Sequence, residues 1–320
     1  MDVTAASPDT ADVTAASWDS EVPLGACFGF EIRSTLPFTL LRKGGGDPLS
    51  IMSVDERPKP RGEPLLEWLP RSDRSLHAKI FADGDRYRMW TDLEGWFTID
   101  PSGQLVTAPP CEDAIRLEER ILSIPLLLSF LPRGDLPLHA AAVEIDGSAV
   151  LLAAPGYHGK TTLAAAFLGA GFRILTEDIA CCQVGEFPML FPGPAMLRVR
   201  TPSYERLEFP GTRVVAREPG RVHLALEGSA KGDGSPVPLR GIVFLRLDEG
   251  EGTIEQVPPA TALPDVWALS LKLPSDAARA RCFLSAAALV DRVPVWNLRR
   301  ALRYDTLPAL VDLIQRTCAT

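Results

Sequence analysis

The chain has 320 residues, a length that suits two domains better than one, and 46% of them are hydrophobic, enough for packed cores. The formal net charge of −8 argues against non-specific binding to nucleic acid, which requires a basic face. The most apolar run, residues 121–131, contains Pro125 and is shorter than the roughly 20 residues of a membrane helix, so no membrane-spanning segment is expected.

The N-terminal stretch 1–20 contains the same six-residue sequence twice, at 2–7 and 12–17. Small and polar residues dominate there, which predicts a flexible tail. The stretch lacks the apolar segment of a signal peptide, and the six cysteines of the chain form no C-x-x-C pair. These features are typical of a reduced cytoplasmic protein without a disulfide framework or a structural zinc site.

Residues 21–132 are predicted to form a strand-rich N-terminal domain that ends in a helix. Aromatic residues and alternation over 27–34 and 79–91 indicate strands, and clusters of glycine, proline and charge indicate turns. A helix is expected from about residue 112 to 131, because apolar residues recur there at helical spacing. Pro125 should kink or interrupt this helix, since proline removes a backbone donor.

Residues 133–320 follow a different pattern, in which apolar strands alternate with alanine-rich helices. This alternation is typical of an α/β domain, and we expect an open parallel sheet. Strands are predicted over 149–153, 172–176 and 293–298, and helices over 161–168, 275–291 and 306–317. In the last helix, four apolar residues share one face: Leu307, Leu310, Val311 and Ile314.

Residues 154–161 follow the pattern G-x-x-x-x-G-K-[ST] of a phosphate-binding loop, with Ala154 in place of the first glycine. In such a loop, backbone N–H groups and the N-terminus of the following helix surround phosphate oxygens. Lys160 would reach the β- and γ-phosphates, and the hydroxyl of Thr161 would bind Mg²⁺. A loop that holds Gly-Lys-Thr by chance is the alternative, but the apolar strand before it and the helix after it favour phosphate binding. The predicted nucleotide contacts are Ala154, Pro155, Gly156, Tyr157, His158, Gly159, Lys160, Thr161 and Thr162.

Two positions of the loop need separate interpretation. A glycine at the place of Ala154 often adopts a conformation that alanine cannot share cheaply, so this position is the weakest match to the motif. His158 lies inside the loop, and we expect it to shape the loop or to contact the edge of the nucleotide rather than to catalyse.

His139 is predicted to lie beside the mouth of the loop. Asp146-Gly147 is a strong signal for a two-residue hairpin turn. If Ile145 then pairs with Ser148, the register places His139 opposite Ala154. The alternative is a capping or packing histidine at the start of a strand, and the functional interpretation is favoured over it.

Glu177 and Asp178 follow the strand predicted over 172–176. Ligands of open parallel sheets bind beyond the carboxyl ends of the strands, where the phosphate loop is also expected. One carboxylate could hold Mg²⁺ and the other could orient or deprotonate an incoming hydroxyl. We hypothesise that Glu177 orients the acceptor and that Asp178 serves the metal together with Thr161. A solvated turn at the end of a strand is the alternative.

Six arginines of the second half could clamp phosphates or an acidic peptide, although solvated faces are the simpler interpretation for most of them. Arg240 opens a predicted strand and is the arginine among them that is predicted to contact phosphate or substrate. The six are Arg198, Arg200, Arg240, Arg299, Arg300 and Arg303.

Taken together, His139, the loop 154–161 and the pair Glu177-Asp178 resemble the C-terminal domain of HPr kinase/phosphorylase. The chain is still more similar to HPr-kinase-related peptide serine kinases, such as the lasso-peptide kinases. Further similar segments are the proline-rich 191–198, the strand 238–245 and the segment 293–298, so that the resemblance covers most of residues 136–315. Glu177 stands where this family usually has aspartate.

The resemblance implies a P-loop kinase core of the HPr kinase and phosphoenolpyruvate carboxykinase type, joined to the strand-rich N-terminal domain. It implies ATP and Mg²⁺ as donor and cofactor, and serine as acceptor. It also implies that His139, Glu177 and Asp178 are catalytic, and that Lys160 and Thr161 contact the nucleotide and the metal.

The sequence therefore predicts an ATP-dependent kinase that transfers the γ-phosphoryl group to a serine-type hydroxyl of a peptide or protein, for example in lasso-peptide tailoring. Two alternatives stay open. One is a kinase for a small-molecule hydroxyl, and the other is a nucleotide-binding regulatory protein with weak ATPase activity. The expected partner is a peptide or protein that bears Ser or Thr, with no nucleic acid and no membrane, and homo-oligomerisation stays open.

Overall fold

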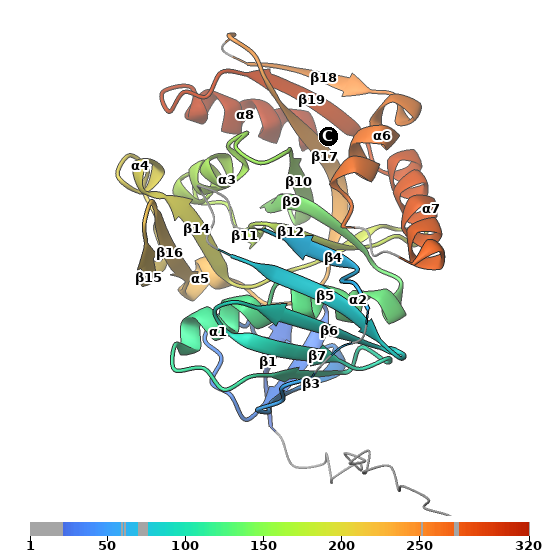
Figure 1. Cartoon of the computed structure of the whole chain (residues 1–320). Helices are drawn as coiled ribbons and strands as arrows, with labels where there is room; N and C mark the ends of the chain where they lie inside the picture. The colour runs from blue at the N-terminus through green and yellow to red at the C-terminus, as the bar shows by residue number, and fades with distance from the viewer. Residues whose placement is uncertain are drawn as a thin grey trace, which may run out of the picture.

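The computed structural model describes residues 22–58, 60, 62–69, 76–250, 252–271 and 275–319. The tail predicted over 1–20 lies outside these residues. The described chain is a mixed α/β protein with two eight-stranded sheets and one three-stranded sheet (Figure 1). No helix in these ranges is long and apolar enough to cross a membrane.

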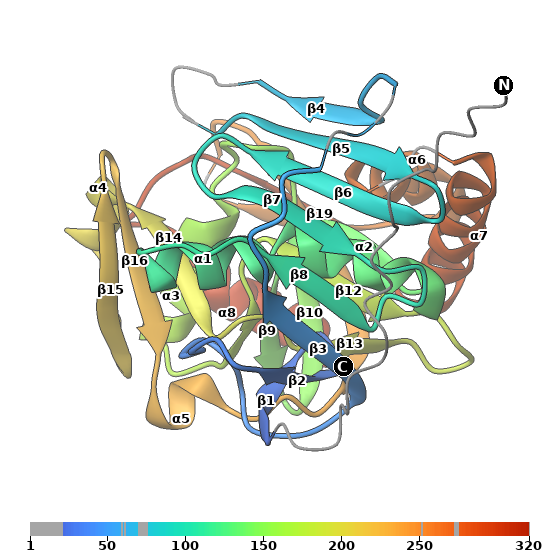
Figure 2. The ribbon, with the colours of Figure 1, turned by 60° about the horizontal axis from the view of Figure 1, so that its bottom comes forward.

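The N-terminal sheet contains the first eight strands in the order β1-β2-β3-β8-β7-β6-β5-β4 (Figure 2). The segments 27–34 and 79–91, which were predicted to contain strands, each contain a hairpin turn, where glycines at 29 and 84 take positive φ values of 77° and 66°. Side chains alternate between buried and exposed along β3 and β5, as expected for a sheet with one covered face. The strands are β1 Pro23–Cys27, β2 Phe30–Ser34, β3 Asp47–Ser53, β4 Leu66–Trp68, β5 Ala78–Asp83, β6 Arg86–Thr91, β7 Gly95–Ile99 and β8 Leu105–Ala108.

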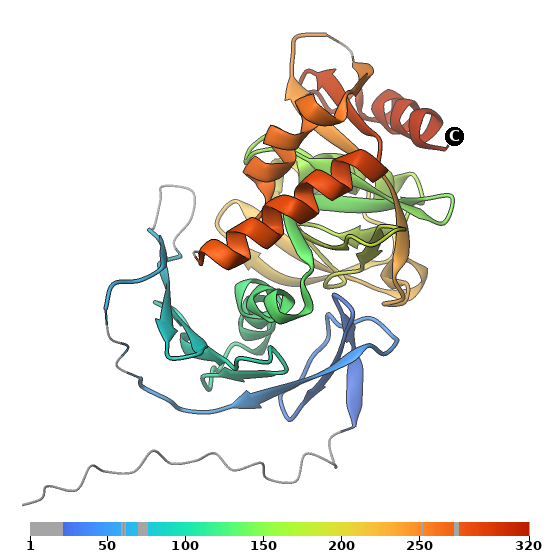
Figure 3. The same ribbon diagram turned by 90° about the vertical axis from the view of Figure 1, so that its right-hand side faces the viewer.

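Two short helices, α1 (Ala114–Ile121) and α2 (Ile124–Arg133), replace the single helix expected over about 112–131. The predicted interruption is confirmed: Pro125 lies in the first turn of α2, where its missing N–H costs nothing. The apolar face of α2 covers the N-terminal sheet, and Phe130 contacts Phe28 edge to face with ring centroids 5.1 Å apart. Figure 3 shows the helix between part of this sheet and the second half of the chain.

The second sheet has the order β10-β9-β12-β13-β17-β19-β18, with β11 paired to β9 and β10 also paired to β17. It is mixed, which corrects the expected open parallel sheet. Only the β10–β17 and β17–β19 pairs are parallel, because tight hairpins such as β9–β10 force antiparallel pairing. The strands are β9 Leu136–Ile145, β10 Ser148–Ala153, β11 Ile174–Thr176, β12 Ile179–Gln183, β13 Met189–Phe191, β17 Val237–Leu247, β18 Thr253–Val257 and β19 Val295–Arg300.

The remaining elements surround this sheet (Figure 1). Helix α8 buries the four apolar residues predicted for its inner face, which confirms that prediction. A three-stranded sheet in the order β14-β16-β15 was not anticipated. Its strands are β14 Met196–Arg200, β15 Thr212–Glu218 and β16 Arg221–Leu226, and the helices are α3 Lys160–Gly169, α4 Thr201–Tyr204, α5 Gly228–Lys231, α6 Pro259–Leu269, α7 Asp276–Arg292 and α8 Leu307–Cys318.

Arg42 connects the N-terminal region to the second sheet. Its side chain is fully buried and donates to the carbonyl oxygens of Gly193 at 2.8 Å, Ile174 at 2.8 Å and Leu175 at 3.1 Å, and also to that of Lys231. Burial lowers the pKa of Arg42 to about 10. Because two of these carbonyls belong to β11, this arginine ties the N-terminal region to the strand that precedes Glu177 and Asp178.

Candidate active site

The β9–β10 hairpin has the predicted register. Ile145 pairs with Ser148 and Ala140 pairs with Ala153, so the next position, His139, lies opposite Ala154. Both turn residues, Asp146 and Gly147, have positive φ values of 48° and 72°, as a type I′ turn requires. On its other side β9 pairs with β12, where His139 lies opposite Ile179. His139 therefore stands between the start of the loop and the segment that carries the two carboxylates.

The loop between β10 and α3 closes without strain at Ala154. Among the described residues other than glycine, positive φ values occur at Phe28, Asp146 and Tyr157 alone, so Ala154 needs no glycine-like conformation. Gly159, with a φ of 74°, is the N-cap residue of α3, and no side chain of the described residues caps the first turn of that helix. His158 shapes the loop through its Nδ1, which lies 2.8 Å from the carbonyl oxygen of Gly156. Uncapped N–H groups at a helix start are suited to an anion.

Lys160 is the first residue of α3 and is only 7% exposed. Its Nζ donates to the carbonyl oxygens of Ala154 at 2.9 Å and Pro155 at 3.4 Å, so the side chain folds back over the loop. Burial lowers the pKa of Lys160, while the charges of Asp178 and Glu177 act in the opposite direction. A buried ammonium group held mainly by carbonyl oxygens would gain from a phosphate nearby.

Glu177 lies against the start of α3. The hydroxyl of Thr161 donates to Oε1 of Glu177 at 2.6 Å, and Nε of Arg198 donates to Oε2 at 3.2 Å. The carboxylate is 7% exposed, so these two partners compensate for most of its desolvation. The pair brings the residue predicted to bind Mg²⁺ within direct contact of a carboxylate.

Asp178 faces His139 and Arg198 instead. Its Oδ1 lies 3.1 Å from Nε2 of His139, and its Oδ2 accepts from Nη2 of Arg198 at 3.1 Å. Desolvation acts to raise the pKa of Asp178, but the hydrogen bond from His139 and the charge of Arg198 outweigh it and hold the pKa well below its usual range. Burial likewise acts to lower the pKa of Arg198, and the charges of Glu177 and Asp178 outweigh it and raise that pKa. The side chain of Asp178 is 45% exposed, so it remains accessible from solvent.

These contacts favour the opposite assignment of the two carboxylates to the one hypothesised from the sequence. Thr161 contacts Glu177 and not Asp178, so Glu177 is better placed to share a metal ion with the loop. Hydroxyl and carboxylate oxygens are hard donors that suit Mg²⁺. The described residues contain no group of three or more His, Cys, Asp or Glu side chains able to hold a metal. Thr161 and Glu177 fit an ion whose other ligands are phosphate oxygens and water, as is usual for Mg²⁺ with nucleotides.

A cavity of about 30 Å³ opens at the two carboxylates. One of its walls comes from the N-terminal region, because Phe28, Glu119, Leu122 and Ser123 line it. The other lining residues are Thr176, Glu177, Asp178, Ile179, Pro194, Met196 and Arg198.

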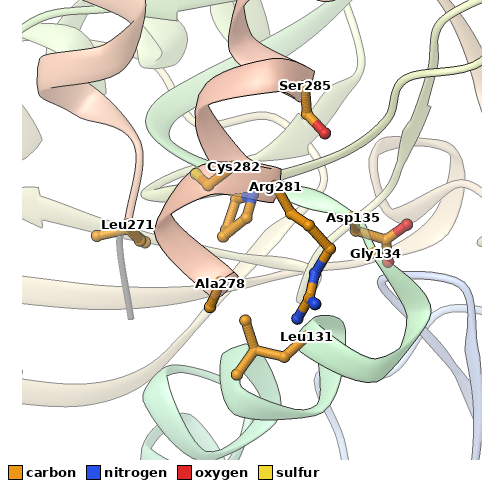
Figure 4. Close-up of a pocket in the computed structure, with 9 residues that line it drawn as sticks. Leu131, Gly134, Asp135, Leu271, Ala278, Arg281, Cys282 and Ser285 are labelled. Carbon is orange, nitrogen blue, oxygen red and sulfur yellow. The ribbon is translucent and has the colours of Figure 1, made fainter. Parts of the chain in front are cut away.

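A second cavity, of about 20 Å³, lies between α2 and α7 and is shown in Figure 4. Asp135 and Arg281 are among the residues that line it. The Oδ2 of Asp135 pairs with Arg133. This cavity contains none of the predicted site residues.

Arg240 is not part of the site. The β10–β17 register places it near Ala149, at the end of β10 opposite the loop, about 15 Å away along the strand. Its Nη1 donates to the carbonyl oxygen of Ala319 at 3.0 Å, so it binds the C-terminal end of α8. The prediction that Arg240 contacts phosphate or substrate is therefore corrected.

Arg198, which the sequence analysis did not select as a site residue, contacts both Glu177 and Asp178. The signal in the sequence is a charged residue flanked by the apolar residues Leu197 and Val199 in the middle of β14. Glu119 on α1 was also missed, because a helix far away in the chain carries it.

The conformation of Gly159 leads to a prediction about stability. A Cβ added there would lie 3.0 Å from Nη2 of Arg300, and the φ of 74° is unfavourable for any other residue. Gly159→Ala should lower the free energy of unfolding by about 1–2 kcal/mol. Gly156→Ala is the matched control: a Cβ there meets nothing within 4 Å, and the change should stay within about 0.5 kcal/mol. Urea unfolding of both variants measures the difference, and equal stabilities would contradict the loop geometry.

No family profile and no curated protein match the sequence. Among solved structures, the chain is similar to the HPr(Ser) kinase/phosphatase from Coxiella burnetii, at 10% identity and a TM-score of 0.31. The similar region covers 57% of this chain and 95% of that chain. A TM-score of this size does not establish a shared fold, so the function has to be inferred from the side chains of the site.

Proposed function

We propose that this protein is an ATP-dependent kinase that transfers the γ-phosphoryl group to a serine-type hydroxyl. One observation carries the proposal: the uncapped start of α3, with Lys160 and Thr161, meets Glu177, Asp178 and His139 at one edge of the sheet. Phosphoryl transfer needs mainly the alignment of donor and acceptor and the stabilisation of charge, and these are the groups that supply both.

The loop and α3 form the donor side. The N–H groups of the first turn would bind phosphate oxygens, and Lys160 would exchange its carbonyl partners for the β- and γ-phosphates. Mg²⁺, held by Thr161 and Glu177 together with the phosphates, would neutralise charge on the leaving group. Arg198 already donates to Glu177 and to Asp178 and would hold the two carboxylates in place.

Asp178 and His139 form the acceptor side. A hydroxyl in the adjacent cavity would donate its hydrogen bond to Asp178, whose low pKa keeps it ionised and ready to accept. The hydroxyl oxygen would form a bond to the γ-phosphorus as the bond to the β–γ bridging oxygen breaks, and its proton would pass to the Asp178–His139 pair. ADP and a phosphate ester would be the products.

The acceptor is proposed to be a serine-type hydroxyl on a peptide or protein, as in the tailoring of lasso peptides. The position of the cavity supports this choice, because Glu119 of α1 and Phe28 of the N-terminal region line it together with the two carboxylates. A chain could thus contact the N-terminal region while its hydroxyl reaches Asp178. ATP and Mg²⁺ are the proposed donor and cofactor.

Mass spectrometry of candidate acceptors after incubation with Mg-ATP tests this function. We expect a gain of one phosphate on a peptide Ser or Thr, and no gain when that residue is changed to Ala. Phosphorylation of a free sugar or amino acid, with no peptide modified, would reassign the acceptor to small molecules. ADP release without any phosphorylated product would instead favour a nucleotide-dependent regulatory protein.

A further inference from the structure

Arg300, the last residue of β19, lies behind the loop and is 2% exposed. Its Nη2 donates to the carbonyl oxygen of His158 at 2.8 Å and lies 3.5 Å from that of Gly159, and its Nη1 donates to the carbonyl oxygen of Ala301 at 3.3 Å. Its Nε is buried without a hydrogen-bond partner. The guanidinium group therefore contacts only neutral acceptors in the part of the chain that the structure describes.

No carboxylate compensates for the charge of Arg300 within the described ranges. None pairs with it, and burial alone lowers its pKa. Buried arginines are normally paired with an anion, because an isolated buried charge is costly. Arg198, whose side chain is 29% exposed, has by comparison two carboxylate partners.

The hydrogen bond from Arg300 also fixes the direction of the loop peptides. A peptide group is planar and trans, so its N–H points away from its C=O. With the carbonyl oxygen of His158 directed at Arg300, the N–H of Gly159 must point to the opposite side of the loop. That N–H belongs to the N-cap residue of α3, where an anion is expected to bind.

We propose that Arg300 is a positioning residue of the phosphate loop. It holds the loop so that the N–H of Gly159 points toward the ligand. The phosphates bound by the loop balance the buried charge of Arg300. This inference rests on the proposed function, since it requires that the loop bind phosphate. Arg300, which lies 142 positions after His158, would thus affect phosphate affinity without direct contact with the nucleotide.

The test is the affinity for Mg-ATP and for inorganic tripolyphosphate, measured by calorimetry, together with the melting temperature without ligand. Arg300→Met should weaken both ligands by about tenfold or more and to a similar extent, since the effect concerns phosphate and not the base. Without ligand, its melting temperature should stay within a few degrees of the wild type. The lost hydrogen bonds and the removed cost of an unpaired buried charge act in opposite directions.

Arg299→Met is the matched control. Arg299 precedes Arg300 on β19, is about half exposed, lies 3.5 Å from Glu255, and points to the other face of the strand. We expect it to bind ATP and tripolyphosphate as the wild type does. Arg300→Lys keeps the charge but lacks the planar fork, so an intermediate affinity is expected, and this variant decides the question if Arg300→Met does not fold.

Two results would overturn the inference while the proposed function stands. One is wild-type affinity in both Arg300 variants, and the other is a large fall in melting temperature with an unchanged affinity for ATP. If the wild-type protein itself binds neither ATP nor tripolyphosphate, the proposed function fails first and this inference fails with it. The wild-type measurement alone therefore separates the two failures.

Discussion

Replacement of Lys160 by alanine should abolish phosphoryl transfer in a protein that still folds. The lysine is placed to neutralise charge that develops between the β- and γ-phosphates, and preorganised groups of this kind are worth about 10²–10³ in rate. The fold should persist, because the partners of the ammonium group among the described residues are two carbonyls of its own loop. Steady-state rates of ADP and phosphopeptide formation measure the loss of transfer, and melting temperatures of the same proteins show whether the fold persists.

Lys79→Ala provides the control for this experiment. Lys79 lies on β5 of the N-terminal sheet and pairs with Glu67 at 3.1 Å. Its loss should leave the rate unchanged, since surface ion pairs contribute little even to stability. A folded Lys160→Ala protein with full activity would contradict the assignment of the phosphate loop.

The pH dependence of nucleotide binding should reflect the lowered pKa of Lys160. Burial lowers the pKa of Lys160, and the group must be protonated to attract phosphate. As the pH rises, the affinity for ATP should therefore begin to decline at a lower pH than it would if the lysine had an ordinary pKa. Lys160→Ala should lack this decline, so affinities measured across the alkaline range distinguish the two proteins.

The geometry around His139 was predictable because it depends on one short turn. A two-residue turn at Asp146-Gly147 leaves a single register for the strands on either side, and that register places His139 opposite Ala154. The position of Glu177 and Asp178 was also predictable, although the expected sheet type was wrong. Both β10 and β11 are antiparallel to β9, so they run in the same direction and end at the same edge.

The partners of these residues were not predictable, because they come from distant parts of the chain. Arg198 belongs to a strand of the small sheet β14-β16-β15, and no local pattern shows that this sheet packs against the carboxylates. Arg300 reaches the loop across 142 positions, and Arg42 reaches β11 across 132. A charged side chain in an apolar strand is the one available signal, and it does not identify the partner.

Neutralising Glu177 and neutralising Asp178 should change the reaction rate in different ways. Glu177 contacts the hydroxyl of Thr161, so Glu177→Gln should raise the Mg²⁺ concentration needed for half-maximal rate and recover much of its activity when Mg²⁺ is abundant. Asp178→Asn removes the group that accepts the proton of the acceptor, so its rate should fall by about 10²–10⁴ at every Mg²⁺ concentration. Rates measured over a Mg²⁺ titration separate the two cases.

Asp248→Asn is the control, since Asp248 is exposed and, among the described residues, its carboxylate accepts from the neighbouring backbone N–H of Glu249. Its rate should match the wild type throughout the titration. If Asp178→Asn is rescued by Mg²⁺ and Glu177→Gln is not, the roles of the two carboxylates are the reverse of those proposed here. If neither substitution alters the rate, the pair is a plain surface turn.

The hydrogen bond from His139 to Asp178 should be visible in the pH profile of the reaction. It is the largest effect that lowers the pKa of Asp178 against the opposing desolvation, and the charge of Arg198 acts in the same direction. Because that pKa lies below its usual range, Asp178 stays ionised as the pH falls, and the wild-type rate should not decline through its protonation in the mildly acidic range. His139→Asn removes the hydrogen bond, so the pKa of Asp178 should rise and an acidic limb should appear at higher pH. An Asp178→Asn background removes the titrating group, so adding His139→Asn there should produce no further shift. A profile of the single His139→Asn variant that coincides in shape with the wild type would show that His139 does not act on Asp178.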